Sequence, residues 1–172
     1  METTRRDFLD YLIGGAIVGG IMGFSYPIIK SLAPSKEDIK TAIVRVNIGD
    51  IEHFGAKVVS WKGKPVIVMR LPKGFEWKGK VEEKRNYEIL RDKEVFALIG
   101  ICTHLGCIPL WRPKGDSDYH QPHLHCPCHG GIYTPWGDVV AGPPPSPLKL
   151  PPQKIEGNML VIGESGFVME IT

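Results

Sequence analysis

Two short stretches, residues 102–107 (CTHLGC) and 126–131 (CPCHGG), contain all four cysteines of the chain. Each stretch places a thiol and an imidazole close together, as Cys-x-His in the first and as Cys-x-x-His in the second. Together they can supply two sulfur and two nitrogen ligands to a metal centre. Such a set would suit tetrahedral zinc, but zinc alone leaves one additional cysteine in each stretch without a role. We therefore expect the fold to bring these two stretches together around a metal centre.

The two stretches resemble the loops of the Rieske family of [2Fe-2S] proteins, which read C-x-H-x-G-C and C-x-C-H. In that family two cysteines hold one iron and two histidines hold the other. The resemblance implies that Cys102 and Cys126 bind the inner iron. It also implies that His104 and His129 bind the outer iron, which faces solvent.

The same resemblance implies a disulfide between Cys107 and Cys128, which would tie the two loops together. Disulfides persist best outside the cytosol. The cysteine pattern therefore predicts an exported domain.

Residues beside the two motifs are expected to tune or cover the cluster. By the resemblance, Tyr133 corresponds to a hydrogen-bond donor to the cluster sulfurs, whereas Gly131 stands where respiratory members have a serine. Loss of a hydroxyl donor leaves the reduced, more negative cluster less stabilised, so its potential should be lowered and suited to a low-potential quinol such as menaquinol. Leu105 is expected to form an apolar cover and part of a docking surface. Pro143 and Pro144 resemble the rigid proline loop that covers the third side of the cluster.

The N-terminal region predicts a membrane anchor. Residues 11–29 contain no charged side chain, and at about 1.5 Å per helical residue this run nearly crosses a hydrocarbon core. Residues 4–9 (TRRDFL) resemble a twin-arginine export signal, and no convincing cleavage site follows. We therefore expect an uncleaved anchor at residues 1–30, with a single pass through the cytoplasmic membrane. By the positive-inside rule the N-terminus is cytoplasmic and the domain lies on the periplasmic or outer face.

Three glycines recur at every fourth position of this run: Gly15, Gly19 and Gly23. This spacing places a smooth stripe on one face of a helix, where another transmembrane helix can approach closely. The stripe predicts a membrane partner.

The remainder of the chain predicts an all-β fold. Twenty glycines and 15 prolines among 172 residues favour short strands joined by turns over a helical bundle. Apolar or alternating runs predict strands at residues 41–48, 57–61, 65–71, 95–101, 148–155, 159–162 and 167–171, and residues 57–61 and 65–71 are expected to form a hairpin around residues 62–64. Residues 123–126 lead into the second cysteine stretch, and residues 132–134 lead out of it. Residues 72–91 are expected to form a charged excursion with a short helical turn, and residues 108–121 a turn-rich connection.

The resemblance adds an arrangement to these strands. It implies antiparallel Rieske-type base sheets with a small inserted cluster-binding subdomain at about residues 102–145, within a domain of residues 41–172. Residues 31–40 are polar and are expected to form a flexible linker between anchor and domain.

Three further histidines, His120, His123 and His125, lie just before the second motif. His125 is adjacent to Cys126, and neighbouring residues of a strand point to opposite faces, so it is a poor second ligand to the same ion. We interpret these three as surface or packed histidines.

The resemblance implies the electron-transfer subunit of a cytochrome bc-type quinol oxidoreductase. In this function His129 and His104 hydrogen-bond to a membrane quinol, and the electron passes to a c-type cytochrome. The expected partners are a cytochrome b subunit and a c-type cytochrome subunit, within a dimeric complex.

Three other functions share some of these sequence features. The small Rieske subunit of an arsenite-oxidase-like enzyme shares the export signal, and an exported zinc-binding structural module shares the Cys and His ligands. A soluble oxygenase ferredoxin fits less well, because such proteins generally lack the anchor and the disulfide. A net charge of +2 and the lack of a basic block give no support for nucleic acid binding.

Overall fold

The computed structural model describes residues 4–31, 43–81, 83–117, 119–164 and 166. The chain divides into two compact units, Met1–Ile39 and Lys40–Thr172. Each unit is considered by itself below.

The first unit is built on a single long helix, α1 (Arg5–Ser31), of 27 residues. Thr4 caps its start, since the Thr4 amide and hydroxyl donate to the Asp7 carboxylate at 2.9 and 2.7 Å, an arrangement that satisfies groups left unpaired at a helix end. None of the helix residues is buried, and the helix is long and apolar enough to cross a membrane. All of the predicted linker except Ser31 lies outside the described residues.

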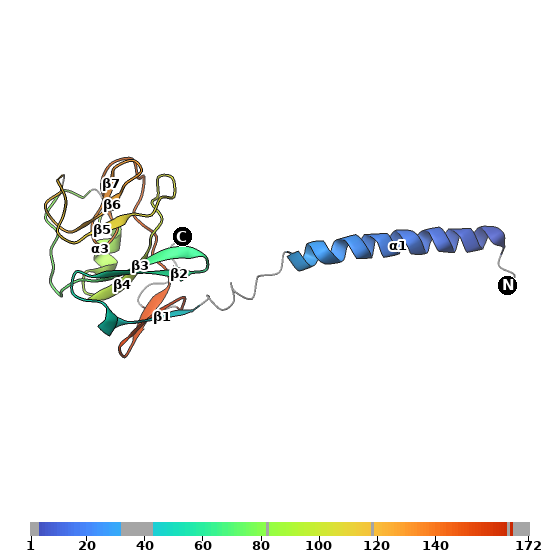
Figure 1. Cartoon of the computed structure of the whole chain (residues 1–172), viewed down its shortest axis with the longest axis horizontal. Coiled ribbons are helices and arrows are strands. Elements are labelled where there is room, and N and C mark those ends of the chain that lie inside the picture. Colours follow the sequence, from blue (N-terminus) through green and yellow to red (C-terminus); the bar gives the residue numbers. More distant parts are fainter. Residues whose placement is uncertain (1–3, 32–42, 82, 118, 165, 167–172) are drawn as a thin grey trace. The chain divides into compact units, whose positions relative to one another are not determined.

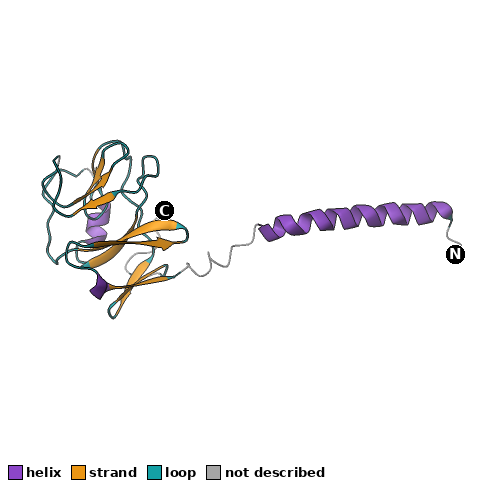
Figure 2. Cartoon of the chain, in the orientation of Figure 1, coloured by secondary structure: helices purple, strands orange, loops and turns teal. Residues whose placement is uncertain are grey.

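The described part of the second unit consists mainly of three antiparallel sheets (Figures 1 and 2). The first sheet has the order β1-β10-β9, the second β2-β3-β4 and the third β5-β6-β7-β8. The strand bounds are β1 (Val44–Asn47), β2 (Ala56–Trp61), β3 (Lys64–Arg70), β4 (Val95–Ile99), β5 (Leu110–Arg112), β6 (His123–Cys126), β7 (Gly131–Tyr133), β8 (Val139–Ala141), β9 (Gln153–Glu156) and β10 (Met159–Ile162). Two short helices, η1 (Ile48–Asp50) and α3 (Arg85–Leu90), accompany them. The predicted all-β class is confirmed.

Strands β3 and β4 of the second sheet are buried on both faces, which explains why both read as continuous apolar runs. Along β3, Val66 and Val68 belong to a core shared with β1 and β10. Ile67 and Met69 alternate with them and belong to a second core that includes Cys102. Figure 1 shows this sheet between β1 on one side and β5, β6 and β7 on the other. The middle sheet therefore supports the two cysteine-containing stretches through the core that includes Cys102 and Cys126.

The β2-β3 hairpin forms where the sequence predicted it. Its two turn residues, Lys62 and Gly63, have φ of 48° and 72°, and Trp61 pairs with Lys64 across the turn. Positive φ at both central residues gives a turn whose twist matches that of the flanking strands.

Several predicted boundaries were wrong because tertiary pairing outweighs local pattern. Residues 108–121 contain strand β5, and β8 was not predicted at all. The predicted strand at 148–155 begins only at Gln153; Leu148 and Leu150 are buried without strand pairing, since prolines at 147, 151 and 152 remove backbone donors. The predicted closing strand at 167–171 lies outside the described residues.

Residues 72–91, which had no assigned role, contain α3 and contact the third sheet. The Asp138 carboxylate accepts from the Asn86 and Tyr87 amides at 2.8 and 2.9 Å, and so caps the start of α3 from a distant loop. The buried Asn86 side chain donates to the carbonyls of Trp136 and Leu148 at 3.0 and 2.8 Å. The segment of residues 72–91 therefore holds the connection between β7 and β8 in place through the contacts of Asn86 and Tyr87.

Candidate metal centre

The two cysteine loops have the same backbone turn. The Gly106 amide donates to the Cys102 carbonyl at 2.9 Å, and the Gly130 amide donates to the Cys126 carbonyl at 3.1 Å. Both glycines have positive φ, 85° and 68°, a conformation that other residues adopt at a cost. The glycine four places after the first cysteine of each loop is thus required by the turn itself.

A disulfide joins the loops. It links Cys107 to Cys128 across a sequence separation of 21, and the structure thus contains the pairing that the resemblance implied. The other two cysteines, Cys102 and Cys126, are free thiols and both are buried.

The two free thiols lie in contrasting electrostatic surroundings. Burial raises the pKa of the Cys102 thiol, but hydrogen bonds from the Tyr133 hydroxyl and from the His104 and Leu105 amides bring it below its usual value. Burial and the hydrogen bond with Cys102 raise the pKa of the Cys126 thiol, against the opposing effect of amides from the second loop. Amide donors therefore point at both sulfurs, which is the environment that a metal-bound thiolate needs.

The Tyr133 hydroxyl is held in place by a residue that sequence reasoning missed. The hydroxyl donates to Cys102 Sγ at 3.2 Å and accepts from the Thr103 amide at 3.1 Å. The Thr103 hydroxyl in turn donates to the Ser146 carbonyl at 2.7 Å. Thr103 occupies an unspecified position of the Cys-x-His motif, so the sequence offered no signal for this positioning role.

The two predicted histidine ligands lie side by side. Their ring centroids are 4.7 Å apart with an interplanar angle of 86°. His129 is exposed and His104 is partly buried. His104 Nδ1 is buried and has no hydrogen-bond partner. A buried ring nitrogen without a partner is costly unless something binds it, and a metal ion is such a partner.

The predicted cover residues differ in exposure, and one of them packs against Gly131. Leu105 is 70% exposed, and Pro143 is exposed while Pro144 is buried. A Cβ atom on Gly131 would lie 2.6 Å from Pro144 Cγ. The proline ring therefore occupies the space that a side chain at position 131 would need.

Comparison with known proteins agrees with this geometry. A family model described as the Rieske [2Fe-2S] domain matches residues 49–152, more than half of the chain. The chain belongs to the Rieske [2Fe-2S] family. Its cofactor is accordingly a [2Fe-2S] cluster of the Rieske type.

Full-length relatives support the same conclusion. The Rieske chain is 30% identical over 170 residues to the ubiquinol-cytochrome c reductase iron-sulfur subunit of Rhodospirillum rubrum, covering 94% of this chain and 92% of that one. It is 33% identical over 166 residues to the subunit of the same name from Rickettsia felis, covering 88% of each. A chain of a solved structure titled hyperthermophilic respiratory Complex III is 43% identical, with a TM-score of 0.58, and the match covers 88% of this chain and 98% of that chain.

The residues present in this Rieske domain fit a [2Fe-2S] cluster. Two buried free thiols receive amide hydrogen bonds, and the same two loops carry two imidazoles, one of which has a buried nitrogen without a hydrogen-bond partner. Two sulfur and two nitrogen donors correspond to the mixed ligand set of Rieske centres.

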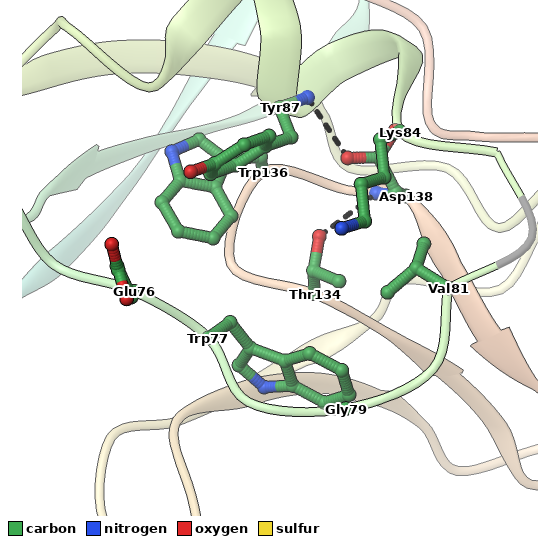
Figure 3. A pocket seen from close by; sticks show the side chains of 9 residues that line it. All are labelled: Glu76, Trp77, Gly79, Val81, Lys84, Tyr87, Thr134, Trp136 and Asp138. Atoms are coloured by element: carbon green, nitrogen blue, oxygen red, sulfur yellow. Dashed lines mark hydrogen bonds between the residues drawn. The ribbon is translucent and has the colours of Figure 1, made fainter.

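A separate pocket lies next to α3 (Figure 3). It has a volume of about 260 Å³, and none of the four predicted ligands lines it. Tyr87 stacks edge-on against Trp136 with centroids 4.7 Å apart, and Trp77 lies on the opposite side of the pocket in Figure 3. The same view shows Asp138 accepting from the Tyr87 amide, while the Asp138 amide donates to Thr134 Oγ1 at 3.1 Å. The pocket is thus framed by the contacts that hold α3 to the third sheet.

The other three histidines do not share one environment. His120 is exposed, in line with its interpretation as a surface residue. His123 is fully buried, and both His123 and His125 contact Asp116.

Proposed function

We propose that this chain is the iron-sulfur subunit of a quinol–cytochrome c reductase of the cytochrome bc type. The relatives named above are subunits of such reductases. The observation that carries the proposal is the exposed His129 ring close to His104, in a site whose two free thiols are buried. A reactant in the membrane can contact the histidine side of this site, while the sulfur side stays enclosed.

In this proposal each ligand has its own role. Cys102 and Cys126 would hold one iron of the cluster, and His104 and His129 would hold the other. When bound, the [2Fe-2S] cluster supplies one-electron acceptance at a potential raised by the two neutral imidazole ligands. Cys107 and Cys128 keep the two ligand loops together.

With the cluster bound, His129 would accept a hydrogen bond from the quinol hydroxyl and hold the proton on its imidazole ring, with His104 as a second contact. Histidine suits this step because small changes in its surroundings move its proton affinity across neutral pH. Leu105, at 70% exposure, supplies an apolar contact for the docking site on a cytochrome b subunit. The electron then passes to a c-type cytochrome subunit.

We infer the following division of the chain: an anchor at residues 1–30, a linker at 31–40, and a Rieske domain at 41–172 with its cluster-binding subdomain at about 102–145. The anchor places the N-terminus in the cytoplasm and the domain on the periplasmic or outer face of the cytoplasmic membrane. The glycine stripe of α1 provides a contact for a neighbouring transmembrane helix, within a dimeric complex.

We propose a low-potential quinol such as menaquinol as the substrate. Tyr133 provides a hydroxyl donor to Cys102 Sγ, whereas position 131 offers no hydroxyl. With fewer donors the reduced cluster is less stabilised, so a potential near the lower part of the Rieske range is expected.

The test is electron paramagnetic resonance of the purified full chain in detergent after reduction with dithionite, followed by a potentiometric titration across pH. A Rieske-type signal with a midpoint that falls at alkaline pH is expected. His129→Gln should remove that signal, whereas His120→Gln, at an exposed histidine outside the site, should retain it. A colourless, zinc-containing protein without a signal would overturn the proposal, and a midpoint near the top of the Rieske range would overturn the menaquinol assignment alone. In membranes with the partner cytochromes, quinol-dependent reduction of the c-type cytochrome should depend on His129 and not on His120.

A further inference from the structure

Three side chains outside the cluster loops converge on one point. Asp116 Oδ2 lies 3.0 Å from His123 Nε2 and 2.9 Å from His125 Nδ1. The three candidate ligand atoms lie within 4.8 Å of one another. His123 and His125 are two residues apart on β6 and share a face, whereas the alternating residues Leu124 and Cys126 belong to the core beneath the cluster loops. The convergence point is therefore on the other face of the strand that ends in Cys126.

The hydrogen-bonding groups around His123 leave an unfavourable contact unless a cation lies there. His123 Nδ1 is 2.9 Å from the Gln121 carbonyl oxygen, which only accepts, so Nδ1 carries the hydrogen. In a neutral ring Nε2 is then a lone pair, and it faces the Asp116 carboxylate oxygen, which also only accepts. The His123 side chain is 0% exposed, so water does not screen the repulsion between these two acceptors. Either a second proton or a metal ion must separate them.

Two features of the surroundings are those of a metal site. A ligating histidine characteristically donates its other ring N–H to a backbone carbonyl, which fixes the tautomer, and the Gln121 carbonyl does this for His123. The carboxylate is oriented as well, because Asp116 Oδ1 accepts from the Tyr119 amide at 3.1 Å and the Asp116 amide donates to the Tyr119 carbonyl at 2.8 Å. Oδ2 is thereby aimed at the two imidazoles.

The spacing and exposure also suit a divalent transition metal. With bonds of about 2.0–2.1 Å, tetrahedral ligands around zinc lie about 3.3 Å apart. The two contacts of Asp116 Oδ2, at 3.0 and 2.9 Å, are within a few tenths of an ångström of that spacing, and all three ligand atoms lie within 4.8 Å of one another. The side chains of His125 and Asp116 are 23% and 22% exposed, which leaves solvent access for a water as fourth ligand. Two imidazoles and one carboxylate match the ligand preference of zinc.

We propose that Asp116, His123 and His125 form a second metal site, for zinc or a similar divalent transition ion, separate from the [2Fe-2S] ligands. The ion ties the connection between β5 and β6 to strand β6. Since β6 delivers Cys126 to the cluster, the site stabilises the strand that carries a cluster ligand. This inference is independent of the proposed quinol chemistry.

The test uses the full chain in detergent with its cluster loaded, equilibrated by dialysis against zinc at buffered micromolar free concentration. Zinc and iron are counted per chain by mass spectrometry, and X-ray absorption at the zinc edge reports the ligand atoms. We expect one zinc in addition to the two irons of the cluster, with nitrogen and oxygen ligands and no sulfur. The melting temperature should rise with zinc in the wild-type chain.

Two variants and one control complete the experiment. Asp116→Asn keeps the size of the side chain but removes its charge, and His125→Gln removes a ligand; each should weaken zinc binding by about tenfold or more, since even outer-shell changes cost about 10–100-fold. His120→Gln removes a neighbouring exposed histidine and should bind zinc as the wild type does. Both variants should retain the electron paramagnetic resonance signal of the cluster, which shows that they are folded.

Three results would overturn the proposal. The first is a cluster-loaded wild type that binds no zinc, which would mean that a second proton on His123 separates the acceptors. The second is zinc binding of equal strength in the wild type and in both variants. The third is zinc with sulfur ligands together with a loss of iron, because zinc would then have replaced the cluster.

Discussion

Replacing Tyr133 by phenylalanine should lower the midpoint potential of the cluster. The change removes the hydroxyl that donates to Cys102 Sγ at 3.2 Å, while the buried ring can stay in place. Burial and the hydrogen bond with Cys102 raise the pKa of Tyr133 above its usual value, so the hydroxyl keeps its proton and acts as a donor throughout a titration. A donor to a ligand sulfur stabilises the more negative, reduced state more than the oxidised state.

The size of the effect follows from the hydrogen bond. A bond to a charged acceptor contributes about 1.5–3 kcal/mol, and both redox states of the cluster use it, so only part of this energy changes on reduction. If that part is about 1 kcal/mol, the midpoint falls by about 40 mV, because a tenfold change in a one-electron equilibrium constant corresponds to about 59 mV and about 1.4 kcal/mol. The Thr103 amide also loses its acceptor, so thermal stability should fall as well.

The measurement is a potentiometric titration followed by electron paramagnetic resonance, on the wild type and Tyr133→Phe at the same neutral pH. Tyr87→Phe is the matched control, since it removes a hydroxyl from a ring that packs on Trp136 next to α3. The control should leave the potential unchanged. An unshifted potential in Tyr133→Phe, or an equal shift in both variants, would refute the role assigned to this hydrogen bond.

Three further predictions concern the scaffold. Cys107→Ser should lower the free energy of unfolding by about 3 kcal/mol, the value expected for a loop closed over a separation of 21 residues, and should reduce the iron content. A double variant that also changes Cys128 to serine should behave the same in denaturation and iron assays. Cluster stability equal to that of the wild type would rule out the role of the disulfide. Burial raises the pKa of Asp138 to about 6, so the folded state binds more protons than the unfolded state between about pH 4 and 6. The midpoint of thermal unfolding should therefore fall as pH rises through this range. Asp138→Asn should flatten this pH dependence of stability, and an unchanged slope in the variant would contradict the reasoning. Gly131→Ser should destabilise the domain by about 1–3 kcal/mol, because the new Cβ would lie 2.6 Å from Pro144 Cγ. Thermal melts of Gly131→Ala should show the same loss of stability. A loss of stability confined to the serine variant would assign the effect to the hydroxyl instead.

Local features of the fold were predictable because they depend on residues close together in the chain. The hairpin at Lys62 and Gly63 needs only a glycine and two apolar runs. Helix α1 needs only its long uncharged run, and it begins where Thr4 and Asp7 can cap it. The strand β4 preceding the first loop was found from its apolar residues alone.

Features that depend on distant partners were not predictable. Strands β5 and β8 are three residues each, too short for a periodic signal, and they exist because β6 and β7 pair with them. The cap of α3 by Asp138 joins residues about 50 positions apart. Nothing near either end of that contact in the sequence indicates it.

For the metal centre, the sequence by itself determined the family and the candidate ligands, because the spacing of cysteine, histidine and glycine in each loop is local and chemically specific. Tertiary structure decided how the loops face each other, that Thr103 holds the Tyr133 hydroxyl against Cys102, and that Pro144 fills the space beside Gly131. It also decided that the Asp116 carboxylate contacts His123 and His125, which the sequence by itself indicated only as surface or packed histidines. The physical reason is that a motif fixes which atoms are available for a bond, whereas the packing of distant segments fixes which of those atoms meet.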